Sequence, residues 1–182
     1  RSVAIESISD GETMTMTRSG IKSAATALGI VLIIGLAYYV FTAPYVRFPG
    51  VRIGGTLTAA PADWTSVNEE KVAFLKLAGF PPFVIRVWYV GEQAGIITAT
   101  RPDNGYWARR VRSNPEGWLR IGDRTYALTG REVLGEARTP YLEKYGAKYN
   151  MPMGRDFVGA IVPGANEPLH TWEVFYWTPR QD

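Results

Sequence analysis

The sequence predicts a mainly β domain, an antiparallel barrel with two short helices, preceded by a single N-terminal transmembrane helix. Three observations lead to this prediction. An uncharged apolar stretch of 21 residues lies near the start of the chain. Short β-prone segments follow it, separated by turns rich in Gly, Pro, Asn and Asp, and few later segments have helical spacing. The short connections favour an antiparallel barrel over a parallel sheet.

The amino-acid composition excludes several kinds of site and partner. The 182 residues include no cysteine, which excludes disulfides, thiolate metal sites and thiol nucleophiles. The net charge of +3 is mild, and the sequence carries no known nucleic-acid module. We therefore expect no nucleic-acid partner.

The apolar stretch at residues 23–43 is interpreted as a membrane anchor. At about 1.5 Å per residue it would span roughly 31 Å, the thickness of a hydrocarbon core. Tyr38 and Tyr39 stand near one end, as in an interfacial aromatic belt. Gly29 and Gly35 would let another helix approach closely, although glycine is common in membrane spans. A cleaved signal peptide and a buried soluble helix are the alternatives, and the length favours a single-pass anchor.

Four segments are expected along the chain: a polar tail at 1–22, the transmembrane helix at 23–43, a linker at 44–53 and the barrel at 54–182. The tail is polar and aperiodic, so we expect it to be disordered when alone. Basic residues flank both ends of the helix and do not decide its orientation. A short tail before an uncleaved anchor favours a bacterial inner-membrane protein with a periplasmic barrel.

Strand and helix signals follow one another in a simple order. The expected strands lie at 54–61, 71–79, 83–90 and 95–101, in a pair across 117–133, and at 170–180, and the expected helices lie at 106–114 and 139–150. Asn104-Gly105 tolerates positive φ and forms a turn, and Asn114-Pro115 ends the first helix. In the strand at 170–180 bulky residues alternate on both sides. This pattern predicts burial of one face and a partner on the other.

The stretch "IRVWYVGEQAGIITATRPDNGYWARRVRSNPEGWLRIGDRTYALTGREV", with "GGTLTAAPADW" before it and "EVFYWTPR" after it, carries a resemblance. It resembles the split β-barrel proteins of the pyridoxamine-phosphate-oxidase-like class, and most closely their deazaflavin- or FMN-dependent nitroreductase branch. The likeness covers most of residues 54–178 as an order of elements rather than as an invariant motif. It implies a split β-barrel and a flavin-type cofactor held by its phosphate.

By position, the resemblance places phosphate and cofactor contacts on Thr100, Arg101, Trp107, Arg109 and Arg110. The family's second phosphate element, a Gly-Arg-x-Ser/Thr-Gly loop, is missing. Its equivalent, "KLAGFPPFV", has no arginine, serine or threonine, and its two prolines lack backbone donors. We therefore expect no resident cofactor, with FMN or deazaflavin as the alternative. The arginines could instead contact a neighbouring subunit, lipid headgroups or surface carboxylates.

No catalytic residue and no metal site are expected. The single histidine, His170, stands without cysteine or a carboxylate cluster, which makes it a poor ligand candidate. Two functions remain open. The favoured one is a structural accessory subunit of a bacterial bioenergetic membrane complex, respiratory or photosynthetic, that packs through its helix and barrel against other subunits. The alternative is a membrane-tethered FMN- or deazaflavin-dependent oxidoreductase.

Overall fold

The structure, a computed structural model, describes residues 18–41, 50–151, 153 and 167–181. The chain divides into two compact units, Arg1–Tyr38 and Tyr39–Asp182, which are described separately. The expected polar tail, apart from the first residues of the helix, lies outside the described residues. Most of the expected linker, up to residue 49, lies outside them as well.

The described part of the first unit belongs to one helix, α1, at Arg18–Phe41, whose last three residues are counted with the second unit. Within it, Lys22–Tyr39 is long and apolar enough to cross a membrane, with a mean hydropathy of 1.5, and none of this stretch is buried. Its leucines and isoleucines expose more than half of their surface, for example Leu32 at 64%. A β-carbon added at Gly29 or Gly35 would have no neighbouring atom within 4 Å. The side chains of this stretch are therefore mostly exposed within the described chain.

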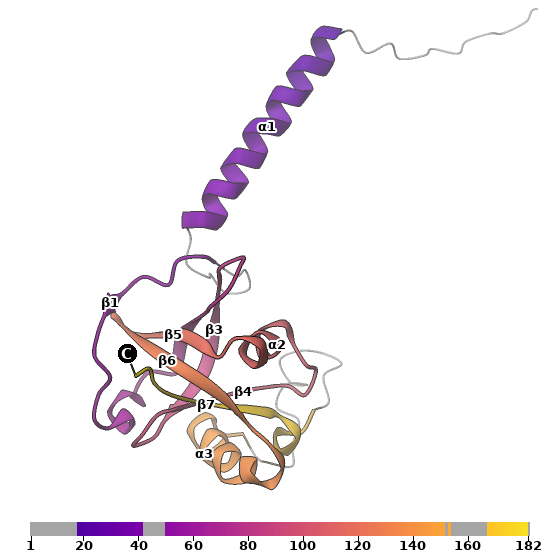
Figure 1. The fold of residues 1–182 in the computed structure, drawn as a ribbon. Coiled ribbons are helices and arrows are strands. Elements are labelled where there is room, and N and C mark those ends of the chain that lie inside the picture. Colours follow the sequence, from indigo (N-terminus) through magenta and orange to yellow (C-terminus); the bar gives the residue numbers. More distant parts are fainter. Residues whose placement is uncertain (1–17, 42–49, 152, 154–166, 182) are drawn as a thin grey trace, which may run out of the picture. The chain divides into compact units, whose positions relative to one another are not determined.

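The second unit is a mainly β barrel (Figure 1). Its strands are β1 (Thr56–Leu57), β2 (Val72–Leu77), β3 (Phe83–Gly91), β4 (Ile96–Thr100), β5 (Glu116–Ile121), β6 (Arg124–Val133) and β7 (Glu173–Pro179). Its helices are α2 (Tyr106–Ser113) and α3 (Thr139–Tyr149), with short 3₁₀ turns η1 (Trp64–Val67), η2 (Gly135–Arg138) and η3 (Leu169–Thr171). The predicted fold class, a mainly β barrel with an N-terminal apolar helix, is confirmed.

Strand pairing closes the barrel. The sheet order is β1-β6-β5-β2-β3-β4-β7, and β6 also pairs with β7, so six antiparallel strands form a ring. In this closing ladder Val133 pairs with Val174 and Leu128 with Pro179. The short strand β1 pairs in parallel with the first two residues of β6. β6 thus has partners on both sides, which removes the free edges that an open sheet would expose.

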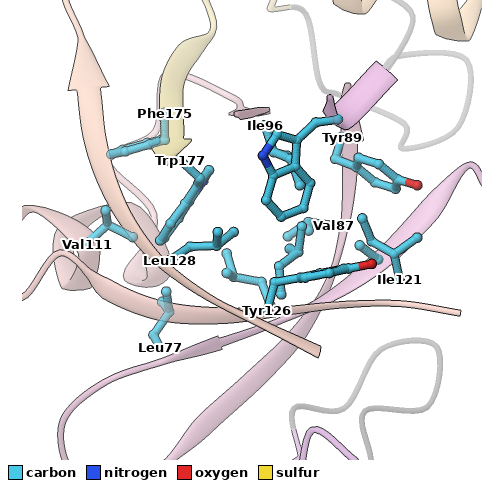
Figure 2. Close-up of a cluster of buried hydrophobic side chains, with 14 of the residues drawn as sticks. Leu77, Val87, Tyr89, Ile96, Val111, Ile121, Tyr126, Leu128, Phe175 and Trp177 are labelled. Carbon is cyan, nitrogen blue, oxygen red and sulfur yellow. The ribbon is translucent and has the colours of Figure 1, made fainter. Parts of the chain in front are cut away.

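The barrel interior is filled by the protein's own side chains. Figure 2 shows Phe175 and Trp177 projecting from β7 among Leu128 of β6 and Val111 of α2. The indole nitrogen of the fully buried Trp177 donates to the hydroxyl of Thr98 at 2.9 Å. Because these side chains fill the interior, a ligand would have to bind on the outer surface of the barrel.

The other face of β7 is also covered from within the chain. Trp172, Val174 and Tyr176 are buried in a second cluster with Leu142 and Tyr145 of α3. The prediction that this face waits for a partner is therefore wrong. The alternation was recognised correctly, but α3 folds back over the strand and supplies the second apolar surface (Figure 1).

Candidate functional site

An open pocket of about 460 Å³ lies between the β2–β3 turn and α2. Its lining residues are Ala78, Gly79 and Phe80 from the turn and Tyr106, Arg109, Arg110, Ser113 and Asn114 from the helix and its C-terminal end. We call it the Arg110 pocket. None of its lining residues is acidic, and two are arginines, so the pocket is suited to a negatively charged group.

Arg110 is the unusual side chain of this pocket, because it is a cation with only 8% of its surface exposed. Its Nε donates to the carbonyl of Ala78 at 2.8 Å, and its Nη1 donates to the Tyr106 hydroxyl at 2.9 Å. Its Nη2 is buried without a hydrogen-bond partner in the described part of the chain. Both of its acceptors are neutral, and arginine keeps its proton in proteins. A buried positive charge thus lacks a counter-ion among the described residues, which is costly without a ligand.

Gly79 makes room for this guanidinium. Its φ of +100° disfavours other residues, and a β-carbon there would lie 3.0 Å from Arg110 Nη2. Next to it, Phe80 exposes 94% of its surface and Tyr106 exposes 48%. The Tyr106 ring also packs edge-on against Phe83, with ring centroids 4.9 Å apart. The pocket therefore combines cationic groups with two accessible aromatic rings.

An ion network fixes α2 on the barrel. Arg112 Nε donates to Glu132 Oε2 of β6 at 2.7 Å, and Nη2 donates to the other oxygen of the same carboxylate. Nη2 also lies 3.1 Å from Glu173 of β7, and Nη1 donates to Asn104 of the preceding loop at 2.7 Å. The hydrogen bond from Arg112 holds the pKa of Glu132 below its usual value. These contacts hold in place the helix that carries Arg109 and Arg110.

The five predicted cofactor contacts do not all converge. Arg109 and Arg110 share the pocket, and Arg109 is exposed. Trp107 packs against the barrel core, with its ring centroid 5.0 Å from that of Phe175. Arg101 Nη2 lies 3.6 Å from Asp103 Oδ2. Neither Arg101 nor Thr100 lines the pocket. The cofactor role of all five stays a prediction.

Sequence reasoning missed six of the eight lining residues, and three of these shape the site: Gly79, Phe80 and Tyr106. The first two belong to "KLAGFPPFV", the segment set aside because it lacks phosphate-binding residue types. The structure brings this segment against α2 regardless of its side chains. Tyr106 lies four residues before Arg110, so helical spacing alone could have paired the two.

A second pocket, of about 480 Å³, lies at the β3–β4 hairpin and is lined by residues that include Glu92, Lys144 and Tyr176. Its two charged side chains form an ion pair with each other, which leaves no unmatched charge between them. Within the described ranges, no group of three or more His, Asp or Glu side chains could hold a metal ion. The Arg110 pocket is therefore the stronger candidate.

No protein-family model matches the sequence, and the comparison with curated proteins gives no match. Solved structures of similar fold exist. A putative pyridoxamine 5'-phosphate oxidase of Listeria innocua is 14% identical, over 64% of this chain and 90% of its own, with a TM-score of 0.47. HutZ, a heme storage protein of Vibrio cholerae, is 17% identical over 64% and 87%, with a TM-score of 0.46. An F420 reductase is 13% identical over 67% and 97%, with a TM-score of 0.43.

Two of these proteins, the putative pyridoxamine 5'-phosphate oxidase and the F420 reductase, are named for activities of the class that the sequence resembles. At such identities and scores the similarity concerns the fold, and it does not decide which ligand this chain binds. The chemistry of a ligand at this site is set by the residues of the Arg110 pocket.

Proposed function

We propose that this protein is a membrane-anchored split β-barrel protein that binds a phosphate-bearing ring compound of the flavin or deazaflavin type in the Arg110 pocket. The observation that carries the proposal is Arg110: a guanidinium with 8% exposure, neutral hydrogen-bond partners and an unsatisfied Nη2. A phosphate group would supply both the missing charge and the missing acceptor.

The remaining residues of the pocket fit such a ligand. Arg109 adds a second positive charge at the rim, and the missing side chain at Gly79 leaves room for the Arg110 guanidinium in the pocket. The half-exposed ring of Tyr106 offers apolar surface to a ring system. A bound flavin or deazaflavin would supply hydride transfer, while the protein binds and orients it. The missing Gly-Arg-x-Ser/Thr-Gly loop predicts weaker phosphate binding than in proteins that have it.

The first test measures binding directly. Detergent-purified full-length protein is titrated with FMN, with coenzyme F420 and with riboflavin, which lacks the phosphate, and fluorescence and thermal unfolding are recorded. We expect saturable binding of FMN or F420 and a loss of about 10- to 100-fold in affinity for riboflavin, the size of one or two charge-assisted hydrogen bonds.

Two matched variants identify the site. Arg110→Met is expected to abolish the ligand-induced rise in melting temperature, while Arg86→Met, which changes an exposed arginine of β3 outside the pocket, leaves it unchanged. Melting of both variants without ligand shows whether they remain folded. If Arg110→Met binds FMN and F420 as tightly as the original protein, the Arg110 pocket is not the site.

The second candidate is the accessory subunit of a larger bioenergetic membrane complex. The observation that favours it is the apolar stretch Lys22–Tyr39, which is long and apolar enough to cross a membrane and has no buried part among the described residues. A colourless protein that binds none of the three ring compounds and co-purifies in mild detergent with defined stoichiometric subunits would support this candidate. A stoichiometric flavin or deazaflavin would reject it as a complete account.

A further inference from the structure

The β2–β3 turn carries the most exposed large apolar side chain of the described barrel. Phe80 exposes 94% of its surface, more than Leu57 and Leu134, which expose 70% each. It lies between Leu77 and Phe83, the pair at which the β2–β3 ladder ends. A ring held out at the tip of a hairpin costs hydration free energy unless it enters an apolar phase.

Positive charge and a second ring flank this tip. Arg109 and Arg110 lie on the facing side of α2, and Tyr106 exposes 48% of its surface beside them. No ion pair neutralises either arginine within the residues that the structure describes, and no acidic residue lines this face of the pocket. An apolar tip with arginines and a tyrosine behind it matches the layers of a membrane interface, where hydrocarbon is followed by phosphate headgroups.

The covalent chain limits how far this tip can be from the proposed anchor. Gly50 forms two backbone hydrogen bonds with Val84, of 3.1 and 2.9 Å, at the start of β3. Only residues 42–49 connect Gly50 to Phe41, the last residue of α1. A chain of that length reaches at most about 30 Å when fully extended. The attachment point on the barrel is one residue beyond Phe83, where the Phe80 turn rejoins the sheet.

We propose that the Phe80 turn and the neighbouring face of α2 form a membrane-docking surface, with Phe80 inserted below the headgroups and Arg109 contacting lipid phosphates. The partner is the surface of an anionic phospholipid bilayer, the one into which α1 inserts. This inference goes beyond ligand binding and rests on the membrane anchor of the proposed function. It places the mouth of the Arg110 pocket at the lipid surface.

The absence of cysteine makes a direct test possible in the full chain. Single cysteines at Phe80→Cys, Leu134→Cys and Leu32→Cys are labelled with a nitroxide and reconstituted into vesicles with or without anionic lipid at about one lipid in three. Accessibility to oxygen, which concentrates in lipid, and to a water-soluble nickel chelate gives the depth of each label. Leu134 is the matched control, because it is also an exposed large apolar side chain. It directly follows the last residue of β6 and so lies outside the β2–β3 turn and α2.

We expect the label at 80 to be accessible to oxygen and shielded from nickel in anionic vesicles, as at 32, while the label at 134 stays in water. Arg109→Gln in the 80-labelled protein should lower the ratio of lipid-immersed to water-exposed label by about fivefold, the contribution of one basic residue near an anionic surface. Retained melting temperature would show that the variants remain folded.

Three outcomes would overturn the proposal. A label at 80 that is as accessible to nickel as the label at 134 means that the turn does not enter the bilayer, although the anchor stands if 32 is immersed. A label at 80 shielded from both agents indicates a protein neighbour instead of lipid. A label at 32 that stays in water rejects the anchor together with the docking surface, and ligand binding by the Arg110 pocket is then judged by its own titration.

Discussion

Lys144 and Lys148 lie one turn apart on α3, yet their surroundings shift their pKa values in opposite directions. The hydrogen bond from Lys144 to Glu92 raises the pKa of Lys144. Burial lowers the pKa of Lys148 to about 8. Its ammonium lies 3.9 Å from the centroid of the Tyr89 ring and 3.2 Å from Asn68 Oδ1, with no ion pair among the described residues. The two side chains form a natural comparison within one helix.

We expect Lys148 to become reactive toward amine-specific acylating reagents at lower pH than Lys144. A lowered pKa means that a large fraction of Lys148 is neutral, and thus nucleophilic, at a pH slightly above that value. Brief labelling over a series of pH values from neutral to strongly alkaline, followed by peptide mass spectrometry, gives a midpoint for each lysine. A Lys148 midpoint at or above that of Lys144 would contradict the role of burial here.

The ion network of Arg112 predicts that the protein loses stability at acidic pH. Because the folded-state pKa of Glu132 is depressed below 4.5, its contribution to stability is present above that value and is lost as the pH falls below it. Glu132→Gln should therefore cost on the order of 1 kcal/mol at about pH 7 and much less at about pH 3. Urea unfolding at both pH values, with the exposed Arg131→Gln as control, measures the difference. Equal destabilisation at both pH values would show that the charge is not what matters.

At the scale of elements, the closure of the barrel depends on two glycines that face one tryptophan. A β-carbon at Gly117 of β5 or at Gly130 of β6 would lie 2.9 or 2.7 Å from the indole of Trp177. The indole of Trp177, a residue of β7, thus occupies the space that side chains at these two positions would need. The ladder between β6 and β7, in which Gly130 pairs with Trp177, requires this close approach.

Gly130→Ala should destabilise the barrel by about 1–3 kcal/mol, the usual cost of overpacking a close-packed interior. The buried indole should also become more accessible, which acrylamide quenching of tryptophan fluorescence would report. Arg131→Ala, next to Gly130 but exposed, serves as the control in thermal unfolding. Unchanged stability of Gly130→Ala would mean that Trp177 can move aside at little cost.

At the scale of the whole molecule, the proposed anchor predicts retention of the protein in the membrane fraction. Leu32→Arg places a charge in the middle of the apolar stretch, at an apparent insertion cost of about 2.5–3.5 kcal/mol. We expect this variant to leave the membrane fraction on alkaline carbonate extraction, while Leu134→Arg, on the barrel, remains in it. Retention of Leu32→Arg to the same extent as the unchanged protein would argue against a single spanning helix.

Sequence patterns were sufficient for most of the fold. Alternation and turn residues located the strands within a few positions. A strand with one buried face alternates apolar and polar residues with a period of two, and this pattern is visible in the sequence. The strand expected at 54–61 shrinks to Thr56–Leu57, because only these residues pair with β6. The composition of "KLAGFPPFV" carried no information on what it faces. The pocket depends on the meeting of this turn with α2, a tertiary contact that no local pattern encodes.

The pairing of β4 with β7 also has a consequence for the order in which the protein matures. Thr100 pairs with Glu173, which lies far along the chain, so β4 must wait for β7 to be synthesised. At the usual rate of roughly 5–20 residues per second, this interval lasts about 4 to 15 s. The apolar stretch at Lys22–Tyr39 leaves the ribosome well before then. With the proposed anchor, targeting of the nascent chain would therefore precede closure of the barrel, and the ring of strands would be completed beside the bilayer rather than before reaching it.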